Sequence, residues 1–241
     1  MSDRTGLDFY ITAPHECSYL PDRTATTLFA DPDVAVGTRM YSMLAEHGFR
    51  RSGRNVYRPQ CKGCTECVSV RVDAGRFEPS KTQRRIWRRN QDLTARVLPA
   101  EFREEHFSLY KKYMQGRHAG GSMDSGDQTR YSDFLISPYV ETLFVELRDK
   151  DRLLCVAVVD ELTSGLSAVY TFFDPDEQAR SLGTQAVLWQ LAEARRRGLP
   201  WVYLGYWIRG CRKMRYKDAF RPFEGYRGAR WVPGESLVNP G

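Results

Sequence analysis

The chain has 241 residues, of which 41% are hydrophobic and 27% charged, a balance that excludes a collagen, a coiled coil and a wholly disordered protein. No stretch approaches the roughly 18 uncharged apolar residues of a membrane-spanning helix, and the N-terminus lacks the apolar core of a signal peptide, so we expect a cytoplasmic protein without membrane contact. The formal charge of +6 is unevenly spread, because residues 76–96 hold seven Lys/Arg against two Asp/Glu and residues 195–230 hold eleven against two. Such blocks favour a polyanionic partner, either nucleic acid or a charged cofactor; solvated helix faces that serve solubility are the alternative.

The first elements in the chain are short. Helical spacing of apolar residues predicts a helix over residues 33–47 that ends at Gly48. Residues 49–57 predict a hairpin, and residues 68–72 predict a strand.

Between that hairpin and that strand lies a run of cysteines. Cys61, Cys64 and Cys67 are each separated by two residues, a spacing that aims successive thiolates at one point. Zinc and iron–sulfur clusters both take four ligands, and Cys17 is the natural fourth. The spacing leaves open whether zinc or an iron–sulfur cluster binds, and reduced thiols without a metal are the alternative.

Two helices are predicted next. The basic segment 80–90 predicts a helix capped by Ser80, with its arginines exposed as a stripe. Residues 100–116 predict an amphipathic helix in which His106 is a satisfied core residue. We expect residues 116–129 to form a flexible loop, where His118 is the one histidine placed like an active-site group.

The second half of the chain changes to period-two patterning. Three successive strands are predicted over residues 140–147, 153–160 and 165–173, followed by a helix over residues 184–197 and a strand over residues 201–205. Cys155, inside the second strand, is expected to be a buried small hydrophobe. This order predicts an α+β fold with a crevice where the sheet meets the helix.

Two features of this half suggest ligand binding. The turn Arg180–Thr184 opens a helix, whose free N–H groups can bind an anion; a plain cap by Ser181 or Thr184 is the alternative. From Trp201 to Lys217 the chain is dense in aromatic and basic residues, a mixture that suits a single-stranded RNA end; core aromatics beside a solvated basic face are the alternative. The sequence contains no phosphate-binding P-loop, no G-x-S-x-G elbow and no H-E-x-x-H motif.

Several motifs recur together, in this order, in one family. They are residues 16–20, the cysteine run 60–67, residues 110–113 with Arg117 and His118, residues 170–175, residues 180–183, and residues 203–208 with residues 213–217. The chain resembles the bacterial aspartate/glutamate leucyltransferases, relatives of the eukaryotic arginyl-tRNA–protein transferases. The resemblance covers essentially the whole chain.

The resemblance implies both a fold and a reaction. It implies a cysteine-containing N-terminal domain over residues 1–75 and a GNAT-like acyltransferase domain over residues 76–241. Leucine would move from Leu-tRNA to the α-amine of a protein that begins with Asp or Glu, which creates an N-degron for degradation. The chemistry requires no cofactor, although the eukaryotic relatives link N-terminal cysteines to an iron–sulfur cluster; carried over, this points to Cys17, Cys61, Cys64 and Cys67, and the different eukaryotic spacing leaves the cluster's identity open.

The proposed reaction sets the roles of the candidate residues. The donor is an activated ester and the α-amine has an ordinary pKa of about 7.7–8.0, so orientation and charge stabilisation matter more than a strong base. For the oxyanion we select Ser167, Tyr170 and Tyr203 as the catalytic group. An acidic N-terminal residue requires a cation, and the substrate-binding candidates are Arg76, Lys81, Arg84, Arg85, His118, Arg180, Gly183, Lys213, Tyr216 and Lys217.

Three other functions remain open at this stage. The first is the same reaction with Arg-tRNA as the donor, because the assignment of leucine depends on the resemblance alone. An acetyl-CoA-dependent N-acetyltransferase is the second, and Gln185 argues against it because it replaces the last small residue of the [R/Q]-x-x-G-x-[G/A] pattern. The third is a non-enzymatic module that binds a metal and RNA.

Overall fold

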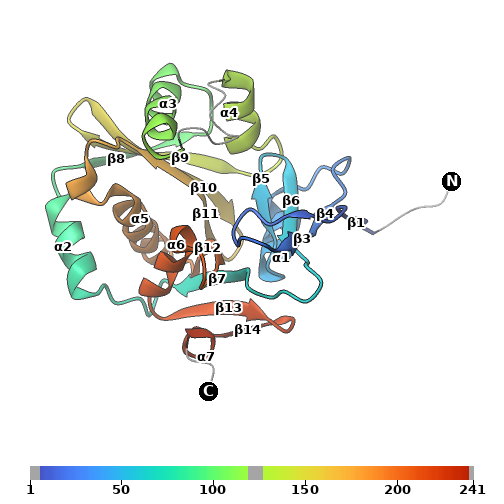
Figure 1. Cartoon of the computed structure of the whole chain (residues 1–241). Helices are drawn as coiled ribbons and strands as arrows, with labels where there is room; N and C mark the ends of the chain where they lie inside the picture. Colours follow the sequence, from blue (N-terminus) through green and yellow to red (C-terminus); the bar gives the residue numbers. More distant parts are fainter. Residues whose placement is uncertain (1–5, 119–126, 239–241) are drawn as a thin grey trace.

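The structure, a computed structural model, describes residues 6–118 and 127–238. Its centre is an eight-stranded mixed sheet in the order β14-β13-β7-β12-β11-β10-β9-β8, and a four-stranded sheet, β1-β4-β6-β5, stands beside it (Figure 1). Over the described residues, no helix combines the length and apolarity that crossing a membrane requires. The α+β class predicted from the sequence is confirmed.

The N-terminal part forms the small sheet and one helix. Its elements are β1 (Phe9–Ile11), β2 (His15–Glu16), β3 (Thr24–Ala25), β4 (Thr27–Ala30), α1 (Thr38–Glu46), β5 (Arg50–Ser52) and β6 (Asn55–Pro59). The predicted hairpin is confirmed as β5–β6. The predicted helix start at residue 33 is wrong, because Asp31 accepts the backbone N–H groups of Asp33 and Val34 in a turn, and α1 begins only at Thr38.

The strand β7 (Val68–Asp73) confirms the prediction for residues 68–72 and carries the chain into the large sheet. It pairs antiparallel with β12 (Trp201–Trp207) on one side and with β13 (Phe223–Arg227) on the other. Residues before position 75 therefore contribute an interior strand to the eight-stranded sheet. The division into domains at residue 75 stays a prediction.

The predicted order of the second half is confirmed. The strands β9 (Thr142–Asp149), β10 (Arg152–Leu162) and β11 (Gly165–Phe173) form an antiparallel meander, helix α5 (Leu182–Arg196) follows, and β12 returns parallel to β11. The remaining elements from residue 94 onward, apart from α3, were not predicted. They are β8 (Thr94–Pro99), α4 (Gln128–Leu135), η1 (Gln178–Arg180), α6 (Arg212–Arg215), η2 (Tyr216–Ala219), β13, β14 (Arg230–Pro233) and α7 (Glu235–Val238).

Both predicted helices of the middle region are present. Helix α2 (Lys81–Arg89) begins at Ser80, which forms a capping box with Gln83 as the basic segment predicted. Helix α3 runs over Glu104–His118, so the expected loop is wrong at both ends: residues 116–118 continue α3, and α4 already starts at Gln128. Residues 119–126 of that expected loop lie outside the described residues.

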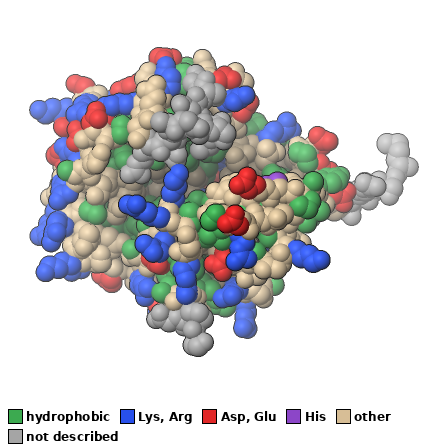
Figure 2. Space-filling view, in the orientation of Figure 1, with side chains coloured by type: hydrophobic (Ala, Val, Ile, Leu, Met, Phe, Trp, Pro, Cys, Tyr) green, Lys and Arg blue, Asp and Glu red, His purple; other side chains and the backbone are tan. Residues whose placement is uncertain are grey.

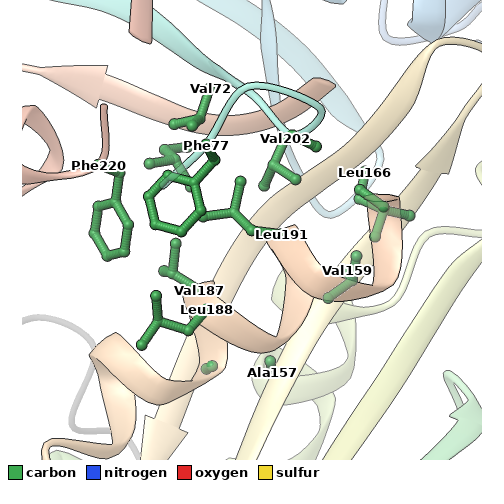
Figure 3. Close-up of a cluster of buried hydrophobic side chains, with 14 of the residues drawn as sticks. Val72, Phe77, Ala157, Val159, Leu166, Val187, Leu188, Leu191, Val202 and Phe220 are labelled. Carbon is green, nitrogen blue, oxygen red and sulfur yellow. The ribbon is translucent and has the colours of Figure 1, made fainter. Parts of the chain in front are cut away.

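Helices cover the two faces of the large sheet. Helix α5 packs Val187, Leu188 and Leu191 against Val159, Leu166 and Val202 of the strands (Figure 3). Helices α3 and α4 pack on the opposite face, through a cluster that includes Tyr110, Tyr131, Phe144, Val156 and Phe172. Cys155 is fully buried, as predicted, and burial raises the pKa of its thiol.

A third cluster joins the small sheet and α1 to the large sheet, with Tyr41 and Tyr203 among its members. Beside it lies a buried ion pair, in which Arg51 of β5 donates to both carboxylate oxygens of Asp160 on β10. The same guanidinium donates to Leu135 O at 3.2 Å and to Thr142 Oγ1 at 2.9 Å. These contacts fix the N-terminal part against β9, β10 and α4.

Candidate active site

The parallel strands β11 and β12 pair over only three residues each. The register joins Gly165–Ser167 to Trp201–Tyr203, while β11 continues to Phe173 and β12 to Trp207. Beyond Ser167 and Tyr203, toward the carboxyl ends of both strands, β11 and β12 therefore no longer pair with each other through backbone hydrogen bonds. In open α/β sheets, ligands bind beyond the carboxyl ends of such strands, where the order of the sheet changes direction.

Arg50 of β5 fills the point where β11 and β12 separate. Its guanidinium donates to Ser167 Oγ at 3.0 Å, to Tyr203 O at 3.5 Å and, by a short bond, to Ala168 O. Tyr41 places its hydroxyl oxygen 3.5 Å from the same Ser167 Oγ. Although it is charged, Arg50 is only 7% exposed, so its position is set by carbonyl and hydroxyl partners on both strands.

Gly205 makes room for this guanidinium. It lies where the β7–β12 register shifts, and its φ of +81° is in the left-handed region that favours glycine. A Cβ atom there would approach Arg50 Nε to 3.3 Å and Arg50 Cζ to 3.4 Å. The irregularity of β12 and the burial of Arg50 therefore depend on each other.

Aromatic side chains gather around Tyr170, two residues after Ala168 in β11. Phe134 of α4 and Tyr113 of α3 both pack on Tyr170 of β11, with ring centroids 5.0 Å and 6.4 Å away. Tyr216 of η2 lies near both Tyr113 and Arg50, since each influences its pKa. Burial raises the pKa of Tyr170 and of Tyr216, so both phenols stay protonated near neutral pH and can donate hydrogen bonds. Tyr216 is 49% exposed, so part of this residue lies at the surface.

Lys217, next in the chain, is buried, and no carboxylate within residues 6–118 and 127–238 forms an ion pair with it. Its Nζ donates to Tyr206 O at 2.5 Å and lies 3.3 Å from Met214 Sδ. Burial, followed by the charge of Arg50, lowers the pKa of Lys217 to about 7. We call Arg50, Tyr113, Tyr170, Tyr216 and Lys217 the splay site; they come from four separate elements, β5, α3, β11 and η2.

The structure brings the four candidate cysteines together beside Lys217. Cys17, Cys61, Cys64 and Cys67 are all reduced and half-buried. Burial, and then the nearness of the other three thiols, raises the pKa of Cys67 to about 12. Four thiols suit zinc or an iron–sulfur cluster chemically. Across residues 6–118 and 127–238, however, no three His, Cys, Asp or Glu side chains are placed closely enough to hold a metal ion.

The three residues selected for catalysis lie on the same pair of strands but differ in surroundings. Ser167 and Tyr203 are buried, and the Tyr203 hydroxyl donates to Glu46 Oε1 by a short bond. Tyr170 is only partly buried, and its hydroxyl lies 3.8 Å from Met114 Sδ. Their catalytic roles stay predictions.

The substrate-binding candidates are more dispersed. Tyr216 and Lys217 join the splay site, and Lys213 is exposed on α6 close by. Arg180 is held by Asp92, Asp149 and Glu177, with the Asp92 contact at 2.8 Å. Gly183 allows α5 to approach β11, because a Cβ atom there would lie 3.3 Å from the Phe173 ring.

The remaining candidates are not among the residues of the splay site. Arg76 is exposed, and its backbone N–H donates to Asp73 Oδ1 at 2.9 Å. Lys81, Arg84 and Arg85 are exposed on α2, which packs on α5. His118 ends α3, and its side chain lies outside the described part of the structure.

Sequence reasoning missed Arg50, the centre of the splay site. Two adjacent arginines in a short hairpin carry no motif, and both would ordinarily be expected at the surface. The partners of Arg50 lie more than a hundred residues further along the chain. No local pattern could have pointed to them.

Comparison with known proteins gives a match along nearly the whole chain. The family model described as "Arginine-tRNA-protein transferase, N terminus" matches residues 15–85, and that described as "Arginine-tRNA-protein transferase, C terminus" matches residues 105–227. A protein of Nitrosococcus oceani named "Aspartate/glutamate leucyltransferase" is 51% identical, over 96% of this chain and 98% of its own length. Proteins of the same name from Hahella chejuensis and Pseudomonas entomophila are 48% and 50% identical, over 96% of this chain and 99% of theirs.

Solved structures resemble the chain less closely. "The structure of L-PGS from Bacillus licheniformis" matches with a TM-score of 0.43 at 14% identity, over 59% of this chain and 47% of that one.

Proposed function

We propose that this chain, which belongs to the arginine-tRNA-protein transferase family, moves leucine from Leu-tRNA to the α-amine of proteins that begin with Asp or Glu. The observation that carries the proposal is the match, at about half identity and nearly full length, to relatives named aspartate/glutamate leucyltransferase. The product carries a new N-terminal leucine and serves as an N-degron. The reaction takes place in the cytoplasm.

The transfer needs no oxidant and no co-substrate besides the aminoacyl-tRNA and the acceptor protein. The lone pair of the acceptor nitrogen attacks the ester carbonyl carbon, a C–N bond forms, and the bond from that carbon to the ribose oxygen breaks. The proton lost by the amine ends on the departing ribose oxygen. A substantial fraction of an α-amine with an ordinary pKa is already neutral at pH 7.5, so the protein mainly has to orient the two substrates and stabilise negative charge.

The splay site supplies groups of the right kind for that charge. The phenols of Tyr170 and Tyr216 are protonated donors, because burial raises their pKa. The positive charge of Arg50 lies between β11 and β12, fixed by Ser167 Oγ and Ala168 O. A fixed cation and preorganised donors stabilise an oxyanion more effectively than mobile water does.

In this proposal the sheet from β9 to β12 is the core of a GNAT-like domain. The antiparallel meander, the helix α5 and the parallel return of β12 support it, together with the loss of pairing beyond Ser167. Arg180 is already occupied by Asp92, Asp149 and Glu177, which favours a donor other than a pyrophosphate-containing acetyl-CoA.

We also keep a metal or iron–sulfur cluster at Cys17, Cys61, Cys64 and Cys67 as part of the proposal. It is supported by the nearness of the four thiols, whereas their positions do not form a ligand cage. If bound, the group would hold the segment 61–67 to the segment around Cys17. No step of the transfer depends on it.

A transfer assay tests the function directly. Purified protein is given radiolabelled Leu-tRNA or Arg-tRNA, with peptides that differ only in a first residue of Asp, Glu or Ala. We expect label to move from Leu-tRNA to the Asp and Glu peptides and not to the Ala peptide. Transfer from Arg-tRNA instead would overturn the donor, and no transfer from either by folded protein would refute the function.

A further inference from the structure

Helix α2 presents a row of uncompensated positive charge. Five of its nine residues are basic and none is acidic, and the basic residues recur at spacings of three and four, which places them along neighbouring rows of the helix. All five are exposed. Figure 2 shows Lys and Arg side chains gathered at the left edge of the molecule, where Figure 1 places α2. We call this set the α2 basic face: Lys81, Arg84, Arg85, Arg88 and Arg89.

The charges of the α2 basic face make few contacts with the rest of the fold. Within the described residues, no carboxylate forms an ion pair with any member of the α2 basic face. Arg84 and Arg89 each donate to one backbone carbonyl, Pro79 O at 2.6 Å and, by a short bond, Ala179 O. By contrast, Arg180 close by is held by three carboxylates.

Helix α2 is nevertheless held firmly against the rest of the protein by packing and hydrogen bonds. Ile86 is buried in the core cluster that includes α5, and the capping box of Ser80 and Gln83 fixes the first turn. Gln83 Nε2 donates to Ala219 O at 3.0 Å, and Asn90 Nδ2 donates to Arg180 O at 2.9 Å.

These anchors also fix the place of α2. Ala219 ends η2, two residues after Lys217, and Arg180 lies in the connection from β11 to α5. The helix is therefore held beside the segments that follow the carboxyl ends of β11 and β12, on the side of the sheet that α5 covers.

The arrangement fits a polyanion better than a single carboxylate. One carboxylate is recognised by one or two cations in a partly buried pocket, whereas the α2 basic face is exposed along its whole length of about 13 Å. A sugar-phosphate backbone presents a line of charges that such a row can match. Trp87, on the same helix, is 37% exposed and offers a ring on which an unpaired base can stack.

We infer that the α2 basic face binds the sugar-phosphate backbone of the aminoacyl-tRNA; this rests on the proposed function. Phosphates held on α2 place the tRNA beside the splay site, where its aminoacyl end reacts. Lys81, Arg84 and Arg85 then serve the donor, and not the acidic first residue of the acceptor as the sequence predicted.

The test measures binding apart from turnover. The triple variant Lys81→Gln/Arg85→Gln/Arg88→Gln removes three charges that make no described contact, and glutamine preserves helix propensity. Binding of deacylated leucine tRNA is followed by fluorescence anisotropy between 0.05 and 0.3 M KCl. Loss of three phosphate contacts should weaken binding on the order of tenfold or more and reduce the slope of log K against log salt by about 2–3.

A matched control has the same net charge. The triple variant Arg23→Gln/Arg39→Gln/Arg230→Gln also removes three exposed cations, from positions outside α2. We expect its tRNA affinity and salt slope to stay within about twofold of the unchanged protein. Circular dichroism checks that both variants are folded.

Two kinds of binding result would contradict the inference. Unchanged affinity in the α2 variant, or an equal loss in both variants, would show that α2 has no special part in tRNA binding. A raised KM for a Glu-peptide with unchanged tRNA affinity would assign α2 to the acceptor. If the unchanged protein binds tRNA through α2 but transfers no leucine, the proposed function fails and the binding surface stands.

Discussion

Replacing Arg50 with lysine tests the central feature of the splay site. The guanidinium donates hydrogen bonds to Ser167 Oγ and Ala168 O, and also to Tyr203 O. A lysine has a single nitrogen on a shorter reach, so at least one of the first two acceptors loses its partner. An unsatisfied buried polar group costs about 1–3 kcal/mol, and a lost hydrogen bond to a charged group about 1.5–3 kcal/mol. We expect Arg50→Lys to lower the free energy of unfolding by about 2–3 kcal/mol.

The activity of Arg50→Lys shows whether transfer depends on the exact position of the groups around residue 50 or only on its positive charge. Lysine keeps the positive charge, so a loss of transfer reports displaced groups; a shift of about 1 Å can cost on the order of 100-fold. Urea unfolding followed by tryptophan fluorescence gives the stability. Leucyl transfer is measured at a temperature where the variant is folded.

Arg54→Lys is the control for that experiment. Arg54 lies in the same hairpin, is exposed, and donates to Pro32 O at 2.9 Å. We expect a change within about 0.5 kcal/mol and normal transfer. If Arg50→Lys were as stable and as active as Arg54→Lys, the guanidinium would not hold β11 and β12 at their point of separation.

Four further predictions follow from the same geometry. Gly205→Ala should lower stability by about 1–3 kcal/mol in urea unfolding, because alanine disfavours a φ of +81° and its Cβ would press on the guanidinium; wild-type stability would refute this. The pKa of Lys217 falls from an ordinary 10.5 to about 7 on folding, so between pH 7 and 9 the unfolded chain binds more protons and stability should rise with pH, by at most about 1.4 kcal/mol per unit; Lys217→Met should be free of this rise, and equal pH slopes would contradict the cause. Metal analysis of anaerobically purified protein should find zinc or iron that Cys67→Ser loses and Cys155→Ala retains; equal content in both variants would place any metal elsewhere. Tyr170→Phe should lower kcat for leucyl transfer about tenfold or more with little change in stability, and an unchanged kcat would remove this phenol from the mechanism.

The parts of the fold that sequence predicted are those decided by local signals. Ser80 and Gln83 stand three residues apart before an amphipathic run, so the capping box of α2 could be anticipated from adjacent residues alone. The meander β9–β11 could be predicted because its strands, buried on both faces by helices, form short apolar runs separated by polar turns. By contrast, β8 is an edge strand with nearly every residue exposed, which leaves no alternation of apolar residues to detect.

The parts that sequence missed depend on distant residues. Arg50 is buried only because Gly205 leaves space and because Ala168 and Ser167 offer oxygens, all of them far along the chain. The predicted start of α1 is wrong for the opposite reason: a very local hydrogen bond, donated by the N–H of Asp33 to Asp31 Oδ1, competes with the helix. Helical spacing of apolar residues cannot register such a bond.

Arg50 and Arg51 together explain why the N-terminal part belongs to the site. They are consecutive in β5, so their side chains leave the strand in opposite directions. Arg51 reaches Asp160 of β10 and Thr142 of β9, while Arg50 reaches β11 and β12. A buried ion pair such as Arg51–Asp160 adds little net stability, but removing one partner costs about 3–5 kcal/mol, so it holds β5 in one position. That position places the Arg50 charge between β11 and β12, and the strands β9–β12 contain no side chain that could replace it there, since the buried cation among them, Arg148, is paired with Glu105 and Glu146.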